Sequence, residues 1–340
     1  MKAIKFFAIS AMAAAMITSC SNEDELSQSN YPSDNIIRVT AGVNNAKTRA
    51  DGAGTELEND FSLTIVNKNT EKPELASKYS YTDKVFSKKS GDWACSETLL
   101  WQNSETPVDI VAFAPAQTGK FNGVYAEGSI QPITYSVADD QSTSSDNNDL
   151  LYYYAKDFNP GTSLVNKKLN IQFNHAFCMI DINVTLGTEF NKPEILKNSP
   201  IIKVILGGTK IAANVDVKNA ATGSTEGSTT TVSVVTASGE AADITATNGS
   251  FKEAANAESY SHSTFSCIAI PQTVGAGTFK VSLLTAGKRY EWTSAEPVEL
   301  KSGYRYTLNL SMGNDVVLLK GGSITATPWT EGTGGSLETE

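Results

Sequence analysis

Apolar and polar residues alternate with a period of two along much of this sequence, whereas helical periodicity is scarce. The segment 178–186 shows the pattern most clearly, because Asp181 and Asn183 lie between apolar residues at every second position: Cys178, Ile180, Ile182, Val184 and Leu186. Successive side chains of a strand point to opposite faces, so this pattern predicts a strand with one buried and one polar face. Burial of a single face is typical of antiparallel sheets.

Short segments with strand-like composition recur along the chain, separated by Gly, Pro, Asn and Ser turns. The predicted strands include Ile36–Val43, Phe61–Ile65, Val108–Ala114, Leu169–Phe173, Ile201–Leu206, Phe265–Ile270, Phe279–Leu284, Tyr304–Leu310 and Val316–Leu319. Residues 220–250 are poor in large apolar side chains, so we expect one strand there, Val232–Val235, between flexible arms. The sequence of residues 251–259 is equally compatible with a short helix and with a loop. The chain is therefore predicted to be all-β, built from sandwiches or barrels.

The N-terminus has the features of an export signal. Lys2 and Lys5 precede an apolar run, 6–17, which is shorter than the roughly twenty residues that a membrane-spanning helix needs. The run leads into Ile17-Thr18-Ser19-Cys20, which resembles the lipobox of bacterial lipoproteins. This resemblance implies that residues 1–19 are a lipoprotein signal peptide, and that Cys20 becomes the first residue and carries acyl chains such as palmitate.

The acidic cluster Glu23-Asp24-Glu25 resembles the signal that sends some lipoproteins to the outer face of the outer membrane, although a solvated acidic linker has the same composition. Removal of residues 1–19 takes away Lys2 and Lys5 and no acid, so the net charge changes from −10 to −12. An acidic chain of this kind is unsuited to nucleic acid or to polybasic membrane attachment. Membrane affinity would therefore come from the lipid on Cys20.

Cysteine and histidine are too sparse to indicate a metal or catalytic site. Cys95, Cys178 and Cys267 lack metal-site spacing, and we expect Cys178 and Cys267 to pack in the core, with a disulfide between them as the open alternative. We expect His175, between two predicted strands, to be a turn or packing residue. The acidic segment 139–149 lacks the pattern of a calcium loop. We expect no catalytic residue, no metal and no cofactor, while a hydrolase with two carboxylates stays as a minor alternative.

Several weak features in a fixed order resemble the fimbrillins, the subunits and associated adhesins of type V pili in Gram-negative anaerobes. After the lipobox come an early strand, an arginine, a tryptophan before a strand, and a C-terminal Gly-Tyr-Arg-Tyr segment. These features are Cys20, Ile36–Val43, Arg49, Leu100-Trp101 with Val108–Pro115, Asp149-Leu150-Leu151, Leu169–His175, Gly303–Tyr306 and Ile324–Trp329.

The resemblance implies two tandem transthyretin-like antiparallel β-sandwich domains after the signal peptide. We expect a linker and removable first strand over 20–49, an N-terminal domain over 50–162 and a C-terminal domain over 163–340. Cleavage after an arginine would remove the first strand, whose apolar residues are Ile37, Val39, Ala41 and Val43. A strand donated by another subunit would then fill the open groove.

Two arginines could mark the cleavage site. Arg49, followed by Ala50, lies in a polar stretch that an arginine-specific protease could reach, and it follows the first strand. Arg38 lies inside the predicted strand, where cleavage would need local unfolding. We therefore expect cleavage between Arg49 and Ala50, with a simple solvated loop as the alternative role for Arg49.

The C-terminus departs from the stalk subunits of the family, which end in a long apolar donor segment. The candidate donor or closing residues are Val316, Leu318, Ile324 and Trp329, and a polar tail follows them. If this segment completes its own domain, nothing is left to donate, and the chain would be a tip, accessory or anchor protein.

The expected function is a structural subunit or adhesin of a type V-like pilus, lipid-anchored in the outer membrane at the cell surface. Its expected partners are other fimbrial subunits through strand exchange, an arginine-specific protease, and host or bacterial glycans or proteins as adhesion ligands. The alternative is a surface lipoprotein that does not polymerise and instead binds carbohydrate, for which Trp93, Trp101, Trp292 and Trp329 are available, or anchors a fimbria.

Overall fold

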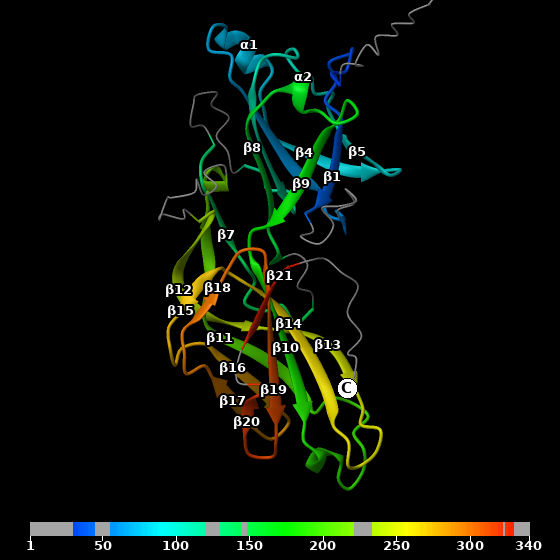
Figure 1. Ribbon diagram of the computed structural model, residues 1–340, viewed down its shortest axis with the longest axis vertical. Helices are drawn as coiled ribbons and strands as arrows, with labels where there is room; N and C mark the ends of the chain where they lie inside the picture. The colour runs from blue at the N-terminus through cyan, green and yellow to red at the C-terminus, as the bar shows by residue number, and fades with distance from the viewer. Residues whose placement is uncertain are drawn as a thin grey trace, which may run out of the picture.

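The computed structural model describes residues 30–44, 55–119, 130–143, 148–220, 233–321 and 324–329. Cys20, the acidic cluster 23–25, Arg49 and Ala50 lie outside these ranges. The molecule is elongated, with two β-rich domains arranged end to end (Figure 1). The prediction of an all-β protein is confirmed.

The first domain is built on one eight-stranded sheet in the order β2-β1-β5-β4-β3-β6-β8-β9. Its strands are β1 Val39–Val43, β2 Thr55–Glu56, β3 Phe61–Asn67, β4 Tyr81–Lys89, β5 Asp92–Cys95, β6 Val108–Ala114, β8 Leu151–Phe158 and β9 Leu169–His175. The sheet closes on itself because β1 pairs with β5 on one side and with β9 on the other. Two short helices, α1 Pro73–Lys78 and α2 Pro160–Ser163, begin with proline, whose fixed φ suits the first helical turn.

The second domain contains a six-stranded and a five-stranded sheet. The six-stranded sheet comprises β10 Cys178–Leu186, β13 Thr247–Lys252, β14 Ser261–Ala269, β19 Tyr304–Met312, β20 Val317–Leu319 and β21 Thr325–Pro328. The five-stranded sheet comprises β7 Ile133–Ser136, β11 Ile201–Val215, β12 Val235–Thr245, β16 Lys280–Thr285 and β17 Arg289–Thr293. A small ribbon of β15 Gln272–Val274 and β18 Val298–Leu300 joins them, and the 3₁₀ turns η2 Thr188–Asn191 and η3 Val217–Ala220 connect strands.

Period-two alternation places the core of the second domain as predicted. Starting from Cys178, every second residue of β10 is buried between the sheets and the residues between them are half-buried, so Ile180, Ile182 and Val184 belong to the core. Asp181 pairs instead with Arg305 on the neighbouring β19, and the Asn183 side chain donates to Asn309 at 3.0 Å. The predicted register of this strand is confirmed.

The strand pairs are antiparallel, as expected, except at two places. β1 pairs in parallel with β9, and β10 pairs in parallel with β19. In both pairs a long stretch of chain separates the strands, which allows the crossover that a parallel pair requires. Alternation along one strand does not report the direction of its neighbour.

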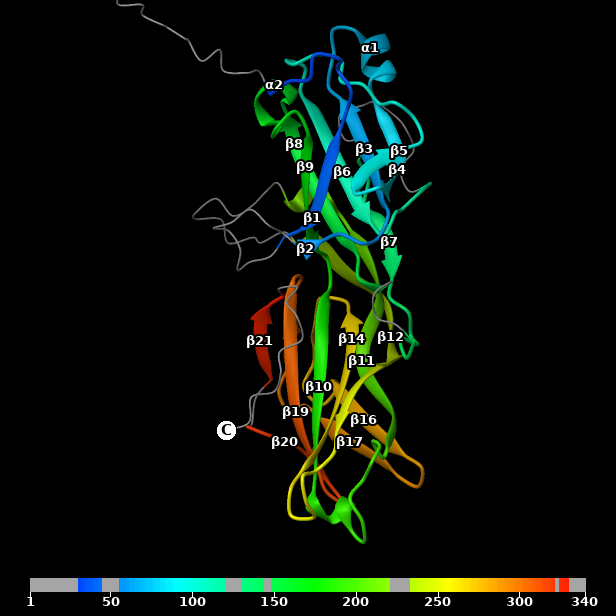
Figure 2. The ribbon, with the colours of Figure 1, turned by 90° about the vertical axis from the view of Figure 1, so that its right-hand side faces the viewer.

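The two domains do not divide at the expected boundary between 162 and 163. β9 lies after that boundary but completes the first sheet, and β7 lies before it but pairs with β11 of the second domain. The chain visits the second domain at β7, returns to the first at β8, and leaves it again between β9 and β10, which follow each other along the long axis (Figure 2). Val111 and Phe113 of β6 pack with the core of the second domain, so the two cores meet at this junction.

The prediction of a single strand within 220–250 is also wrong. β12 begins at Val235 and β13 occupies 247–252, and each lies at the edge of a sheet. Edge strands need few large apolar side chains, so Gly, Ala, Ser and Thr suffice there. Gly208 of the partner strand β11 has a positive φ of 87°, and a Cβ on it would lie 2.1 Å from the carbonyl oxygen of Thr278, so only glycine fits at this bulge.

Candidate functional site

β1 closes the first sheet through backbone hydrogen bonds on both sides. Its parallel register with β9 runs from Val39 opposite Leu169 to Val43 opposite Phe173. The ladder extends beyond both ends of β1, because the Leu169 amide donates to the Arg38 carbonyl at 2.8 Å and the Asn44 amide donates to the Phe173 carbonyl at 2.6 Å. On the other side β1 pairs with β5 and with the two-residue β2. We call these partners in β9, β5 and β2 the β1 interface.

The apolar side chains of the first strand enter the core of the first domain. Ile37, Val39 and Val43 are buried, and Ala41 is half-buried. The Ile37 amide also donates to the Leu99 carbonyl at 2.9 Å. Loss of residues 36–43 would therefore expose a row of unpaired backbone groups together with the apolar residues beneath them.

Aromatic rings form the floor beneath β1. Phe61 lies edge-on to Phe173 at 5.6 Å and to Trp93 at 5.0 Å between ring centroids. Phe173 and Trp93 belong to β9 and β5, the two strands that β1 joins. The ring of Phe61 therefore connects the two sides of the β1 interface independently of β1.

The structure places Arg38, the alternative cleavage residue, at the start of this ladder. Its guanidinium is exposed and binds the carboxylate of Asp34 through two hydrogen bonds of 2.6 and 3.0 Å. These bonds, with the amide of Ile36, lower the pKa of Asp34 to about 2. The Arg38 carbonyl accepts a hydrogen bond from the Leu169 amide of β9. A protease could therefore bind and cut the peptide bond after Arg38 only once β1 had separated from β9.

The C-terminal strands β20 and β21 pair with the same edge of β19 within their own domain. Of the candidate donor or closing residues, Val316 and Leu318 are exposed, Ile324 is half-buried and Trp329 is buried. All four side chains of β21 itself are exposed, so its contacts with the core come from the residues that flank it.

Trp329 holds the end of β21 at the junction between the domains. Its ring stacks on that of His175 with centroids 3.8 Å apart and planes 11° from parallel, and its amide donates to the Gly303 carbonyl at 2.7 Å. His175 is the last residue of β9, and its Nδ1 lies 2.6 Å from a carboxylate oxygen of Asp149. Both side chains are largely buried. This environment agrees with the prediction that His175 is a turn or packing residue.

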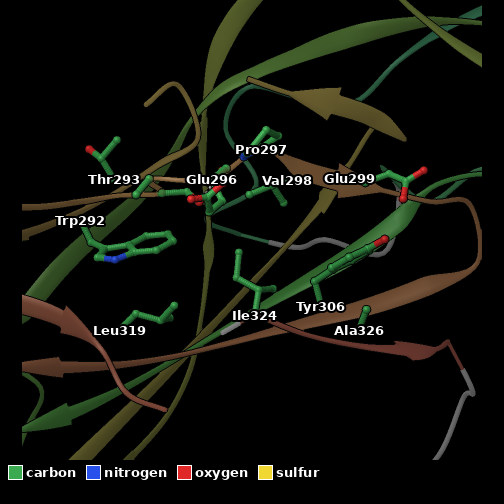
Figure 3. A pocket seen from close by; sticks show the side chains of 12 residues that line it. Trp292, Thr293, Glu296, Pro297, Val298, Glu299, Tyr306, Leu319, Ile324 and Ala326 are labelled. Carbon is green, nitrogen blue, oxygen red and sulfur yellow. Dashed lines mark hydrogen bonds between the residues drawn. The ribbon is translucent and has the colours of Figure 1, made fainter. Parts of the chain in front are cut away.

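A pocket lies in the C-terminal domain, between the end of β17 and the strands β19, β20 and β21 (Figure 3). We call it the edge pocket, and its volume is about 560 Å³. The apolar lining residues include Trp292, Val298, Tyr306, Leu319, Ile324 and Ala326. Glu296 and Glu299, both exposed, contribute carboxylates at its rim.

The three cysteines in the described ranges are free thiols. Cys178 and Cys267 are fully buried free thiols, which confirms the prediction of core packing, and Cys95 is a half-buried free thiol. Burial raises the pKa of Cys267 to about 12 and raises that of Cys178 as well. Within the described ranges, no three His, Cys, Asp or Glu residues gather into a metal site, and no helix there is long and apolar enough to cross a membrane.

Comparison with known proteins identifies the family. The model of the fimbrillin-like family matches residues 48–329. No sequence among curated proteins matches the chain. The match therefore rests on the family model, which covers both domains.

Solved structures share the fold at low sequence identity. A proposed cell adhesion protein from Bacteroides ovatus is 16% identical, with 88% of this chain and 99% of that chain covered and a TM-score of 0.56. A proposed cell adhesion protein from Bacteroides uniformis is 12% identical, with 88% and 100% covered and a TM-score of 0.52. A fimbrial protein from Bacteroides vulgatus is 14% identical, with 87% and 99% covered and a TM-score of 0.50. With the match of the family model over most of its length, the chain belongs to the fimbrillin-like family.

Proposed function

We propose that this protein is a structural subunit or adhesin of a surface fimbria and that it joins other subunits by strand exchange at the β1 interface. Membership of the fimbrillin-like family supports the fimbrial role. The observation that carries the strand-exchange mechanism is the position of β1, which is the first strand of the described chain and also closes the first sheet.

Cleavage after Arg49 is the proposed trigger. Arg49 lies between β1 and β2 in the sequence, so a cut there separates β1 from the domain that it completes. While β1 is covalently attached, its high effective concentration excludes a competing strand. After the cut β1 can dissociate, and a donated strand can pair with β9 and cover the aromatic floor.

The proposed route to the surface is lipidation of Cys20 and anchoring in the outer membrane. Radiolabelled palmitate should enter the wild-type protein in cells that export it and should not enter Cys20→Ser, because the thioether-linked lipid needs this thiol. Equal labelling of both proteins would show that Cys20 is not the lipid site. Protease accessibility on intact cells tests whether the protein is on the outer face of the outer membrane. Wild-type protein is compared with a variant in which Glu23, Asp24 and Glu25 are alanine.

Pairing of β20 and β21 with β19 of the same domain favours a place at an end of the fibre. A stalk subunit must both accept and donate a strand, whereas in this protein the last two strands of the described ranges complete their own sheet. We therefore propose a tip, accessory or anchor position, in which the protein accepts a strand at the β1 interface and donates none.

The test is controlled cleavage of the folded protein. An arginine-specific protease should cut wild-type protein at Arg49, detected by mass spectrometry, and the product should bind a strand peptide from a partner subunit. Arg49→Ala should resist the cut and bind no peptide, whereas Arg38→Ala, the matched control, should behave as wild type. A cleaved protein that stays monomeric and ignores the peptide would contradict the mechanism, and glycan binding by that form would support the carbohydrate-binding alternative.

A further inference from the structure

The edge pocket lies where the two sheets of the C-terminal domain diverge. At one end the sheets are held together, because the Tyr290 hydroxyl donates to the Asn314 carbonyl at 3.0 Å and the Lys288 ammonium donates to the same carbonyl at 2.7 Å. Lys288 also pairs with Asp315 at 2.9 Å. Towards the other end, β17 turns into the segment 294–297 and β21 follows β20 along β19, and the pocket opens between them (Figure 3).

The edge pocket has an unpaired strand on its outer side. Among the described strands, β21 pairs only with β19, so the backbone groups on its other side are open to a further strand. Ala326 of β21 and Ile324 beside it line the pocket, while Thr325 and Thr327 occupy the alternate positions. A strand added along β21 would therefore direct alternate side chains into the pocket.

The chemistry of the lining favours an aliphatic side chain over a sugar. Trp292, Leu319 and Ile324 are half-buried and face the pocket. Two hydroxyl groups nearby already have a hydrogen bond within the protein: the Tyr306 hydroxyl accepts from the Lys301 amide at 2.8 Å, and the Ser294 hydroxyl donates to the Glu296 carbonyl at 2.7 Å. A saccharide needs several placed polar groups, whereas an aliphatic side chain needs only apolar contact.

The rim of the pocket is acidic. Glu296 and Glu299 are both exposed, and the only cation that pairs with either of them among the described residues is Lys301, 3.0 Å from Glu299. A lysine or arginine next to the aliphatic side chain would complement this rim, mainly by favouring encounter and orientation.

We propose that the edge pocket is a second docking site, which binds an extended segment of another fimbrial subunit that carries aliphatic side chains at alternate positions and an adjacent lysine or arginine. The segment adds to the edge of β21 that no described strand covers and inserts an aliphatic side chain between Trp292 and Ile324. Only the source of the segment rests on the proposed fimbrial function. The site lies in the other domain from the β1 interface, and no described strand has to leave before a segment can bind there.

The test uses the uncleaved Arg49→Ala protein, so its outcome is independent of strand exchange at β1. The probe is an N-acetylated, C-amidated octapeptide of alternating lysine and leucine, titrated into ¹⁵N-labelled protein. We expect NMR shift changes centred on the Trp292 indole and on Thr325–Pro328. A peptide with glutamate in place of lysine should bind more weakly. In the Glu296→Gln, Glu299→Gln double variant, the difference in affinity between the two peptides should be smaller.

Two substitutions on β21 provide the matched comparison. Ala326→Tyr fills the pocket and should lower the affinity for the lysine–leucine peptide by at least about tenfold. Thr325→Tyr adds the same side chain to the opposite face of β21, outside the lining of the pocket, and should weaken binding much less than Ala326→Tyr does. Equal affinities of the two variants, or no shift change up to about 1 mM peptide, would overturn the proposal. Shift changes at Trp292 with glucose, galactose or N-acetylglucosamine but not with the peptide would overturn it in favour of a sugar site.

Discussion

At the scale of single residues, the two faces of β10 have different roles. Ile182 is fully buried between the sheets, whereas Asn183, the next residue, is half-buried and bonds to Asn309 across the strand pair. Removal of a buried aliphatic side chain loses its transfer free energy and leaves a cavity, whereas removal of a surface amide loses one hydrogen bond. Neighbouring positions therefore differ sharply in their contribution to stability.

Ile182→Ala should lower the free energy of unfolding by about 2–5 kcal/mol. Asn183→Ala should lower it by less than about 1.5 kcal/mol, the net value of one hydrogen bond. Urea denaturation followed by circular dichroism measures both. Equal losses in the two variants would show that the register of β10 is different.

The buried thiols should be chemically silent in the folded protein. At pH 8 iodoacetamide should modify Cys95 before Cys178 and Cys267, which should react only after unfolding, because alkylation needs an accessible thiolate. Peptide mapping by mass spectrometry identifies the modified residues. Early modification of Cys267 in folded protein would contradict its burial.

The raised pKa of Cys267 also makes stability depend on pH. Its thiol stays neutral in the folded state up to about pH 12, whereas an unfolded cysteine ionises near about pH 8.5. The stability contributed by the neutral thiol is thus complete below the unfolded pKa and falls as pH rises above it. Between about pH 8.5 and 10, the free energy of unfolding should decline more steeply in wild type than in Cys267→Ala.

At the scale of elements, β1 combines a short length with a central position. It spans five residues, yet it supplies the pairs that join β9 to β5 and is the only described partner of β2. A strand in such a position leaves two edges unpaired when it departs. The proposed exchange therefore depends on whether β1 can leave after cleavage.

A reversible cross-link tests this departure. Thr40 and Asn170 are opposite each other in the ladder, and their side chains share a hydrogen bond of 3.1 Å on the exposed face. Neighbouring strands lie about 4.8 Å apart, and this spacing is within the range of Cα separations that a disulfide allows. In the oxidised Thr40→Cys, Asn170→Cys variant, cleavage after Arg49 should not release β1, and no partner peptide should bind.

Reduction of this disulfide should restore release and binding, as measured by size-exclusion chromatography and mass spectrometry. Thr40→Cys alone should behave as wild type under both conditions. If the oxidised variant bound the partner peptide as well as the reduced one, exchange would not occur at the β1 interface.

At the scale of the whole molecule, residues far apart in sequence meet where the domains join. Trp329 from the end of β21, His175 from the end of β9 and Asp149 before β8 form one buried group. The exposed side chains of β21 contribute little to its attachment, so Trp329 should hold both the strand and the junction.

Trp329→Ala should therefore increase hydrogen–deuterium exchange in Thr325–Pro328 and at His175, while the rest of both cores stays protected. Trp329→Phe retains a ring for stacking and should show a smaller increase. A matched change on the exposed face, Leu318→Ala, should leave exchange at the junction unchanged. Unaltered exchange in Trp329→Ala would show that β19 pairing alone retains β21.

Local sequence is sufficient to specify which residues are buried along the regular strands. In β10 and β9, and in β19 from Tyr306 onward, buried side chains alternate with more exposed ones, and alternation depends only on local backbone geometry and on the polarity of successive residues. The same local pattern located β1 and the burial of Ile37, Val39 and Val43. The all-β class followed from these strands.

Strands at edges and in covered positions could not be recognised from alternation. β8 carries three consecutive tyrosines that are half-buried on both faces, so its residues do not alternate, and β12 and β13 are mostly small and polar. Their strand structure is decided by hydrogen bonds to neighbouring strands rather than by their own composition.

The identity of neighbouring strands, by contrast, depends on how the whole chain folds. The parallel pairs of β1 with β9 and of β10 with β19, the transfer of β7 to the second domain and the stacking of Trp329 on His175 all join distant segments. The edge pocket depends on the same kind of contact, since β17 and β21 line it from different sheets. Local polarity fixes the face on which a side chain lies, but the packing of the whole chain selects the partner that covers it.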